Sequence, residues 1–241
     1  MRDILLDLVE HTYDLGCIDL IKITGDDKKT EIIGLGTDQL VIVTGVWHKP
    51  VAEFIGQFGM PNLGKLKILL NLQEYKDENT LITISKNADG APDGINFSNA
   101  SGDFSNNYRF MSSAIVTNMI KNMKYNQPNF HVVFEPTVSG IMRLKMQAQA
   151  HSEENNFLVK TVKNDLKFYF GDSSTHAGEF VFATNITGTI KRSWAYPIKI
   201  VISILDLVGD KTIQISDDGA MEIIVDSGIT AYKYIIPANT K

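Results

Sequence analysis

The sequence predicts an α+β protein built from two similar domains, each with helices packed on antiparallel sheets. Segments with apolar residues at helical spacing alternate with runs of β-branched, strand-like pattern. The order helix, strands, helix, strands occurs twice, and short sequence fragments recur in the same order. The 241 residues, 44% of them hydrophobic, are enough for two domains of about 120 residues with apolar cores.

The first half begins with apolar residues at helical spacing: Ile4, Leu5, Leu8 and Val9. Its acidic residues fall on the opposite face: Asp3, Asp7, Glu10 and Asp14. This pattern predicts a helix to about Asp14. Alternating β-branched sequence predicts strands over residues 17–46 and again over 81–84. Between them, the leucines that follow Pro61-Asn62 predict a second helix.

Residues 111–126 have no settled period, so we expect a connector at 114–126 between domains 1–113 and 127–241. In the second domain, residues 137–150 predict a helix with Thr137 or Ser139 as its cap. A last helix is predicted over 197–208, because Pro197 suits an opening position and Gly209 follows its end. Strands are predicted at 130–134, 157–162, 166–170, 180–186, 212–216, 221–226 and 232–236.

The two halves share sequence fragments as well as element order. A proline opens the second helix of each half, Pro61 and Pro197. Ser-Gly at 101–102 matches Ser-Gly at 227–228, and the aromatic-basic-aromatic triplet at 108–110 matches 232–234. Chance similarity between β-rich segments is the alternative. The common order of the fragments favours a duplication.

Composition excludes several classes of protein. The formal net charge is −5, so any contact with nucleic acid requires a local basic face. A single cysteine, Cys17, allows no intrachain disulfide and is typical of a reducing cytoplasm. The first 16 residues lack the basic start and apolar run of a signal peptide. No stretch reaches the roughly 20 apolar residues of a membrane helix, so we expect no membrane partner.

No compact catalytic or metal-binding motif is present. The histidines are scattered, and none stands three or four residues from another: His11, His48, His131, His151 and His176. Acidic pairs occur with glycine at 25–27 and 217–219, where hairpin turns favour both residue types. Gly34-Leu35-Gly36 lacks the helix and Lys-Ser/Thr of a phosphate loop, and no Gly-x-Ser-x-Gly occurs. We therefore expect a protein that is not an enzyme, without a cofactor or metal.

Several segments resemble one family of proteins. They are residues 192–205, 209–216 and 225–229, the C-terminal Tyr-Ile-Ile-Pro-Ala at 234–238, and Gly-Met-Pro-Asn-Leu-Gly-Lys-Leu at 59–66. These resemble the sliding clamps of tailed phages, DNA polymerase processivity factors related to the proliferating cell nuclear antigen family. The resemblance covers roughly the whole chain and is strongest over 191–238.

The resemblance implies the sliding-clamp fold and a homotrimer, in which six similar domains close a ring with helices lining the hole and a continuous sheet outside. Such a ring encircles double-stranded DNA without reading its sequence, tethers the replicative DNA polymerase, and is placed on DNA by a clamp loader. The location would be the host cell cytoplasm. Ring closure also has a physical reason, because pairing strand edges between subunits removes exposed edges.

Basic residues on and beside the helices are the candidates for facing DNA phosphates: Lys65, Lys67, Arg143, Lys145, Lys191, Arg192 and Lys199. The alternative is that they are ordinary solvated helix charges. The acidic residues of the first helix oppose a basic lining. Either that helix face is turned aside, or the lining is less basic than the family implies.

Apolar residues of the connector and the C-terminus are the candidates for a pocket that takes polymerase and clamp-loader peptides: Met119, Ile120, Met123, Ile235, Ile236, Pro237 and Ala238. Exposed Met and Ile suit a surface that accepts several peptides. The alternative is that they belong to a satellite core. Two other functions are weighed against the clamp. One is a ring-forming viral tail or virion protein, and the other is a hydrolase or nuclease.

Overall fold

The computed structural model describes residues 1–37, 39–120 and 127–239. Its contacts divide the chain into two compact units: Met1–Lys124 with Ser227–Tyr232, and Tyr125–Asp226 with Lys233–Lys241. The last strand, β15 (Thr230–Pro237), contributes to both units, because residues 230–232 belong to the first and the remainder to the second.

The first unit contains α1 (Arg2–Glu10), the 3-10 turn η1 (Tyr13–Leu15), β1 (Leu20–Gly25), β2 (Thr30–Leu35), β3 (Ile42–Trp47), η2 (Ala52–Phe54), β4 (Gly56–Pro61), α2 (Leu63–Asn71), η3 (Gln73–Tyr75), β5 (Leu81–Lys86), β6 (Pro92–Ser98), β7 (Ser105–Arg109) and α3 (Ser113–Met119). One antiparallel sheet has the order β4-β1-β2-β3, with residues 230–232 of β15 next to β3. A second antiparallel sheet has the order β5-β6-β7.

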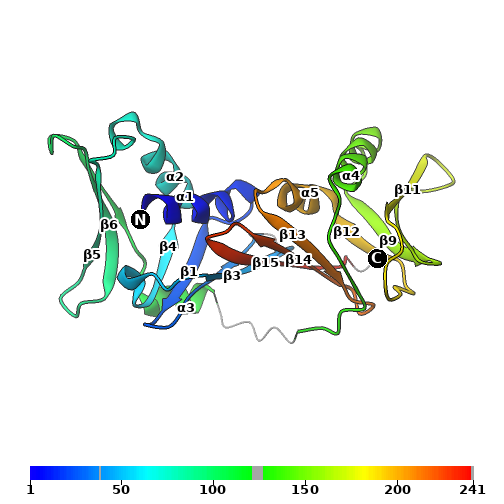
Figure 1. Ribbon diagram of the computed structural model, residues 1–241, viewed down its shortest axis with the longest axis horizontal. Helices are drawn as coiled ribbons and strands as arrows, with labels where there is room; N and C mark the ends of the chain where they lie inside the picture. Colours follow the sequence, from blue (N-terminus) through cyan, green and yellow to red (C-terminus); the bar gives the residue numbers. More distant parts are fainter. Residues whose placement is uncertain (38, 121–126, 240–241) are drawn as a thin grey trace. The chain divides into compact units, whose positions relative to one another are not determined.

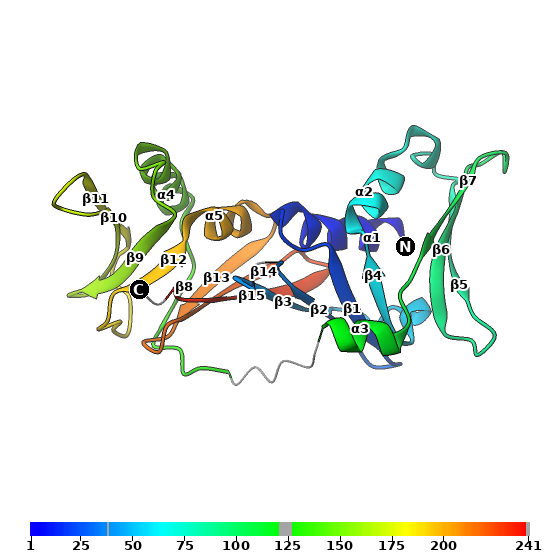
Figure 2. The same ribbon diagram turned by 180° about the vertical axis from the view of Figure 1, so that it is seen from behind.

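Helices cover both faces of the first unit's larger sheet. Figures 1 and 2 show α1 and α2 side by side on one face, with α3 by the other. Glycine at position 59 of β4 allows α3 to approach, because a Cβ there would lie 2.8 Å from the Val116 side chain. The neighbouring residues Phe58 and Met60 point to the opposite face and are buried. Because side chains alternate between the two faces of β4, this strand contacts α3 on one face and buries Phe58 and Met60 on the face that carries α1 and α2.

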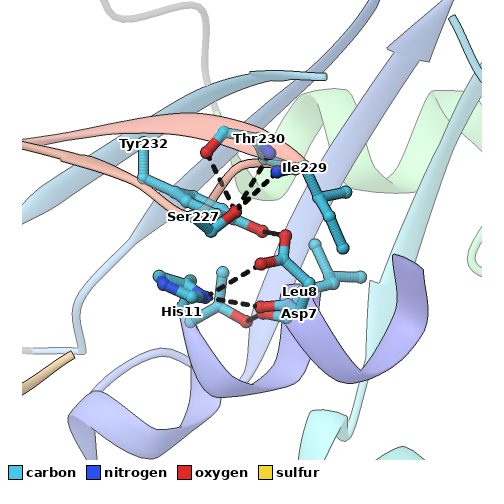
Figure 3. Close-up of polar contacts among 8 residues, drawn as sticks. Asp7, Leu8, His11, Ser227, Ile229, Thr230 and Tyr232 are labelled. Carbon is cyan, nitrogen blue, oxygen red and sulfur yellow. Dashed lines mark hydrogen bonds and ion pairs between the residues drawn. The ribbon is translucent and has the colours of Figure 1, made fainter. Parts of the chain in front are cut away.

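A polar cluster lies inside the first unit, between α1 and the start of β15 (Figure 3). The Tyr232 hydroxyl donates to Asp7 Oδ2 at 2.8 Å, and the imidazole of His11 stacks on the Tyr232 ring. All three side chains are buried. The cluster joins residues 225 positions apart in sequence, so the end of the chain completes the core of the first unit.

The second unit contains β8 (Val132–Phe134), α4 (Val138–Ala150), β9 (Asn156–Val162), β10 (Asp165–Gly171), β11 (Ala177–Ala183), β12 (Trp194–Pro197), α5 (Ile198–Asp206), β13 (Asp210–Ile215), β14 (Ala220–Asp226) and the remainder of β15. One sheet has the order β11-β10-β9-β12, and in the other β15 is followed by β14, β13 and β8. Helices α4 and α5 lie side by side (Figures 1 and 2).

The element order repeats between the halves of the sequence, as predicted. Four strands β1–β4 precede α2 and three strands β5–β7 follow it, while four strands β9–β12 precede α5 and three strands β13–β15 follow it. The four-strand sheets also have equivalent orders, β4-β1-β2-β3 and β12-β9-β10-β11. The topology therefore supports the duplication that the shared fragments indicated.

Some local predictions need correction. The first helix ends at Glu10 rather than near Asp14; the Thr12 hydroxyl donates to Leu8 O at 2.6 Å, and a 3-10 turn follows. Asp7 belongs to the buried face of α1 because Tyr232 supplies a partner there. The segment 111–126, where the sequence predicts no regular element, contains α3, which packs through Val116. Thr137, rather than Ser139, caps α4 by accepting from Gly140 N at 3.0 Å.

Candidate nucleic-acid and partner surfaces

Helix α2 carries the two basic candidates of the first unit. Its leucines are buried, which turns Lys65 and Lys67 toward the outer side of the helix. Lys65 is exposed. Lys67 Nζ lies 2.6 Å from Asp14 Oδ1, so its charge is matched by a carboxylate of η1. Lys65 therefore presents its positive charge to solvent, whereas the positive charge of Lys67 is paired with a carboxylate.

Tyr13 fixes η1 on α2 and so places Asp14. A Cβ at Gly64 would lie 2.7 Å from the Tyr13 hydroxyl, so glycine allows the ring to approach the helix closely. The Lys67 ammonium lies 6.0 Å from the centre of the same ring, a distance at the limit of cation–π attraction. The contact between Asp14 and Lys67 is thus supported by neighbouring packing.

The second unit also has a lysine–aspartate ion pair beside its helices, but here the lysine lies on the first helix, α4, and the aspartate on the second, α5. On α4, Leu144 is buried while Arg143 and Lys145 are exposed. The Lys145 ammonium forms an ion pair with the Asp206 carboxylate at the end of α5. Lys199, on the first turn of α5, is exposed. Sequence reasoning missed Asp14 and Asp206 as partners, because no sequence signal says which helix faces come together.

An apolar stripe also runs along the exposed side of α4. Val138, Met142 and Met146 recur at a spacing of four residues and are 76%, 54% and 63% exposed. Their sequence pattern does not indicate that they are exposed, because helical apolar spacing normally marks a buried face. The basic candidates of α4 therefore stand beside accessible apolar side chains.

Lys191 and Arg192 lie away from the helix residues, in the loop before β12. Both backbone N–H groups donate to Asp217 Oδ1, at 2.8 and 3.1 Å. The Arg192 guanidinium lies 6.0 Å from the centre of the Trp194 ring, whose Nε1 donates to Asp217 O. This loop is held to the β13–β14 turn, whereas Lys199 follows the opposite end of β12.

The connector candidates divide between exposed and buried. In α3 and just after it, Met119 is 58% exposed, while Ile120 is buried. Met123 lies outside the described residues. Met119 is thus the accessible candidate among the described connector residues.

The C-terminal candidates divide in the same way, since Ile235 and Ile236 are buried while Pro237 is exposed. The tail is bonded to its own unit: Ala238 N donates to Gly219 O at 2.7 Å, and Asn239 N donates to Ala195 O at 2.9 Å. Pro237 is therefore held in a defined position at the surface of the second unit.

Glu222 and Lys211 are among the titratable groups of the second unit whose pKa values are shifted by burial. Burial raises the pKa of Glu222, against an opposing attraction from Lys233. Glu222 Oε1 is buried without a hydrogen-bond partner among the described residues. Burial also lowers the pKa of Lys211, whose ammonium donates to the backbone oxygens of Leu207 and Gly209 after α5. That lysine supports the end of a helix and is not one of the basic candidates.

No group of three or more His, Cys, Asp or Glu side chains suited to a metal ion occurs in the described part of the chain. No helix within the same residues is long and apolar enough to span a membrane.

Comparison with known proteins establishes the fold. No protein-family model matches the chain, and no curated protein sequence matches it. Among solved structures it is similar to the clamp chain of the structure described as "C-terminal region of FEN-1 bound to A. fulgidus PCNA", with a TM-score of 0.71 and 8% sequence identity. The match covers 100% of this chain and 97% of that chain. The protein therefore has the sliding-clamp fold of proliferating cell nuclear antigen over its whole described length.

Proposed function

We propose that this protein is a sliding clamp, a homotrimeric ring that encircles double-stranded DNA and tethers a replicative DNA polymerase. A clamp loader places the ring on DNA, and the protein performs no chemistry itself. The full-length fold match supports this function. The resemblance to tailed-phage clamps supports a phage origin, with action in the host cytoplasm.

The observation that carries the proposal is the position of β15 in the first unit. Residues 230–232 of this strand lie next to β3, and His48 N donates to Ile229 O at 2.9 Å. In the repeat, β15 corresponds to β7 and β3 corresponds to β11. Among the described strands, β7 neighbours β6 alone and β11 neighbours β10 alone.

The repeat therefore supplies a rule for assembly. If the pairing of β3 with β15 is copied between molecules, β11 of one copy pairs with β7 of the next. Each copy has one of each edge, so the contact is head-to-tail and can close a cycle. Closure satisfies the backbone groups of both edges, which otherwise attract non-specific strand pairing.

The first experiment is the solution mass by light scattering over a range of concentrations. A mass of three times the 26.8 kDa subunit that persists on dilution supports the closed trimer. A stable monomer at all concentrations contradicts the proposed ring.

The second experiment is DNA synthesis on primed circular DNA with a polymerase and clamp loader of the tailed-phage type. Longer products with the protein present, and loss of the effect when the loader is omitted, support the clamp. A ring that leaves product length unchanged contradicts polymerase tethering and favours a ring-forming viral structural protein.

A further inference from the structure

We infer that Asp14 and Asp206 reduce the attraction of the helix surfaces for DNA, each by ion pairing with a lysine that would otherwise contact phosphate. This inference rests on the proposed function, because it assigns a regulatory role to residues of the proposed DNA-facing layer. It concerns how strongly the protein holds DNA, not whether it forms a ring.

In the first unit, the acidic residue comes from η1 and the lysine from α2. Asp14 Oδ1 lies 2.6 Å from Lys67 Nζ, and Tyr13 packs against Gly64 in the preceding turn of α2. Asp14 is thereby positioned by the packing of its neighbour. Lys65, which lies two positions before Lys67, is exposed and forms no ion pair with the described residues.

In the second unit, the lysine comes from the first helix and the acidic residue from the second. Lys145 of α4 pairs with Asp206 of α5, while Arg143 and Lys199 on the same helices form no ion pair with any residue that the structure describes. The arrangement thus occurs in both units, with donor and acceptor on exchanged elements. The lysines of the two ion pairs lie on helices that are not equivalent in the repeat, α2 and α4, so duplication of one ancestral ion pair does not explain the two pairs.

The pairs add little to the stability of the fold. All four side chains are part-exposed, and exposed ion pairs contribute little because water screens them and side-chain entropy opposes them. Their larger effect is on local charge. The charge of a lysine in contact with a carboxylate is already balanced. Such a lysine neutralises phosphate less, so fewer of the counterions condensed on DNA are released when the protein binds. A ring that must move along DNA benefits from such a weak hold.

The test is the salt dependence of binding to a short linear duplex, measured by fluorescence anisotropy. Asp14→Asn and Asp206→Asn should each bind several-fold more tightly at about 0.1 M salt, with a slope of log K against log salt steeper by about one per freed lysine that contacts phosphate. The matched control is Glu31→Gln, which makes the same change in net charge outside the helix layer. It breaks the 3.0 Å contact of Glu31, on β2, with Lys29 just before that strand.

A second set of variants separates a local effect from a general one. With Lys67→Gln as background, adding Asp14→Asn should give no gain in affinity, because no lysine is left to release. A gain that persists in this background, or a slope equal to that of Glu31→Gln, overturns the inference. Absence of duplex binding by every variant at every salt concentration also overturns it.

Failure of the proposed function has a different signature. A wild-type protein that stays monomeric and leaves polymerase product length unchanged contradicts the clamp. Steeper salt slopes in Asp14→Asn and Asp206→Asn would still support charge reduction by these two residues. Conversely, a working clamp with unchanged slopes retains the function and excludes the role of the two carboxylates.

Discussion

Tyr232 donates its hydroxyl proton to Asp7 across 2.8 Å, and the ring of the same tyrosine stacks on His11 with 4.6 Å between ring centres and 4° between planes. His11 Nδ1 lies 2.9 Å from the Asp7 backbone oxygen and 3.3 Å from Asp7 Oδ1 (Figure 3). One side chain near the end of the chain therefore contacts two successive turns of the N-terminal region. The buried carboxylate of Asp7 is tolerated because these polar groups surround it.

Replacing Tyr232 by Phe should destabilise the protein by about 1–3 kcal/mol, because Asp7 Oδ2 loses its donor in a buried site. The free energy of unfolding from urea titration measures the effect. A double-mutant cycle with Asp7→Asn should show coupling of at least about 0.5 kcal/mol. Additive losses in the cycle would mean that the hydroxyl and the carboxylate act independently.

Placing a charge on the β11 edge should weaken the proposed ring. Val181→Asp introduces a carboxylate on a strand that has one neighbour among the described strands. We expect the trimer mass to fall toward that of the monomer on dilution, with circular dichroism unchanged. Val162→Asp, on β9 inside the same sheet, is the control and should leave the mass unchanged. If both variants kept the trimer mass on dilution, β11 would be excluded from the interface.

Glu222→Gln should stabilise the protein near pH 7 by about 1 kcal/mol, because it removes a carboxylate whose ionised form is disfavoured by burial. The raised pKa means that folding favours the protonated form. The contribution of Glu222 to stability is therefore greatest below the ordinary carboxyl range and falls as pH rises through the pKa of this group in the folded state.

The stabilising effect of Glu222→Gln should consequently shrink as pH falls from 7 toward 4. Urea titrations at several pH values measure it. Glu153→Gln, at an exposed position, is the control and should show no such trend. A constant difference between wild type and Glu222→Gln across this range would contradict the burial argument.

Gly188→Ala should destabilise the protein by more than about 2 kcal/mol, because its φ of 96° disfavours side chains and a Cβ would lie 1.7 Å from His131 O. Gly90→Ala is the matched control. Its φ of 78° is also in the left-handed region, but nothing lies within 4 Å of the new Cβ, so a loss of about 1 kcal/mol is expected. Equal losses measured by thermal unfolding would show that backbone strain alone decides both.

Much of the fold could be predicted from the sequence because local pattern and final burial agree. The leucines of α2 repeat at helical spacing and are buried as that spacing predicts, and α5 buries a similar face made of Ile198, Val201, Ile204 and Leu205. The recurrence of element order was also readable, since each half has a proline before its second helix. These signals are local, so they can be recognised in the sequence without knowledge of tertiary contacts.

The sequence could not predict features that depend on contacts between distant residues. Asp7 fits the polar face of a solvated helix by pattern, yet its partner is 225 positions away. The seven-residue helix α3 is too short to show a clear period, and its support is the space over Gly59. The pairing of Lys145 with Asp206 depends on α4 meeting α5. The candidate pocket residues were selected by family resemblance, which does not say that Ile235 and Ile236 are buried.

The strand that serves both units also governs the order in which the protein can be finished during synthesis. Because residues 227–232 belong to the first unit, that unit stays incomplete on the ribosome until these residues have been synthesised. Until then the edge of β3 has no β15 beside it, and the Asp7 carboxylate has no tyrosine donor. Contacts so distant in sequence slow folding and prolong the exposure of strand edges. A truncated translation product would therefore lack one sheet neighbour in its N-terminal half, and such fragments should be targets for chaperones and proteases.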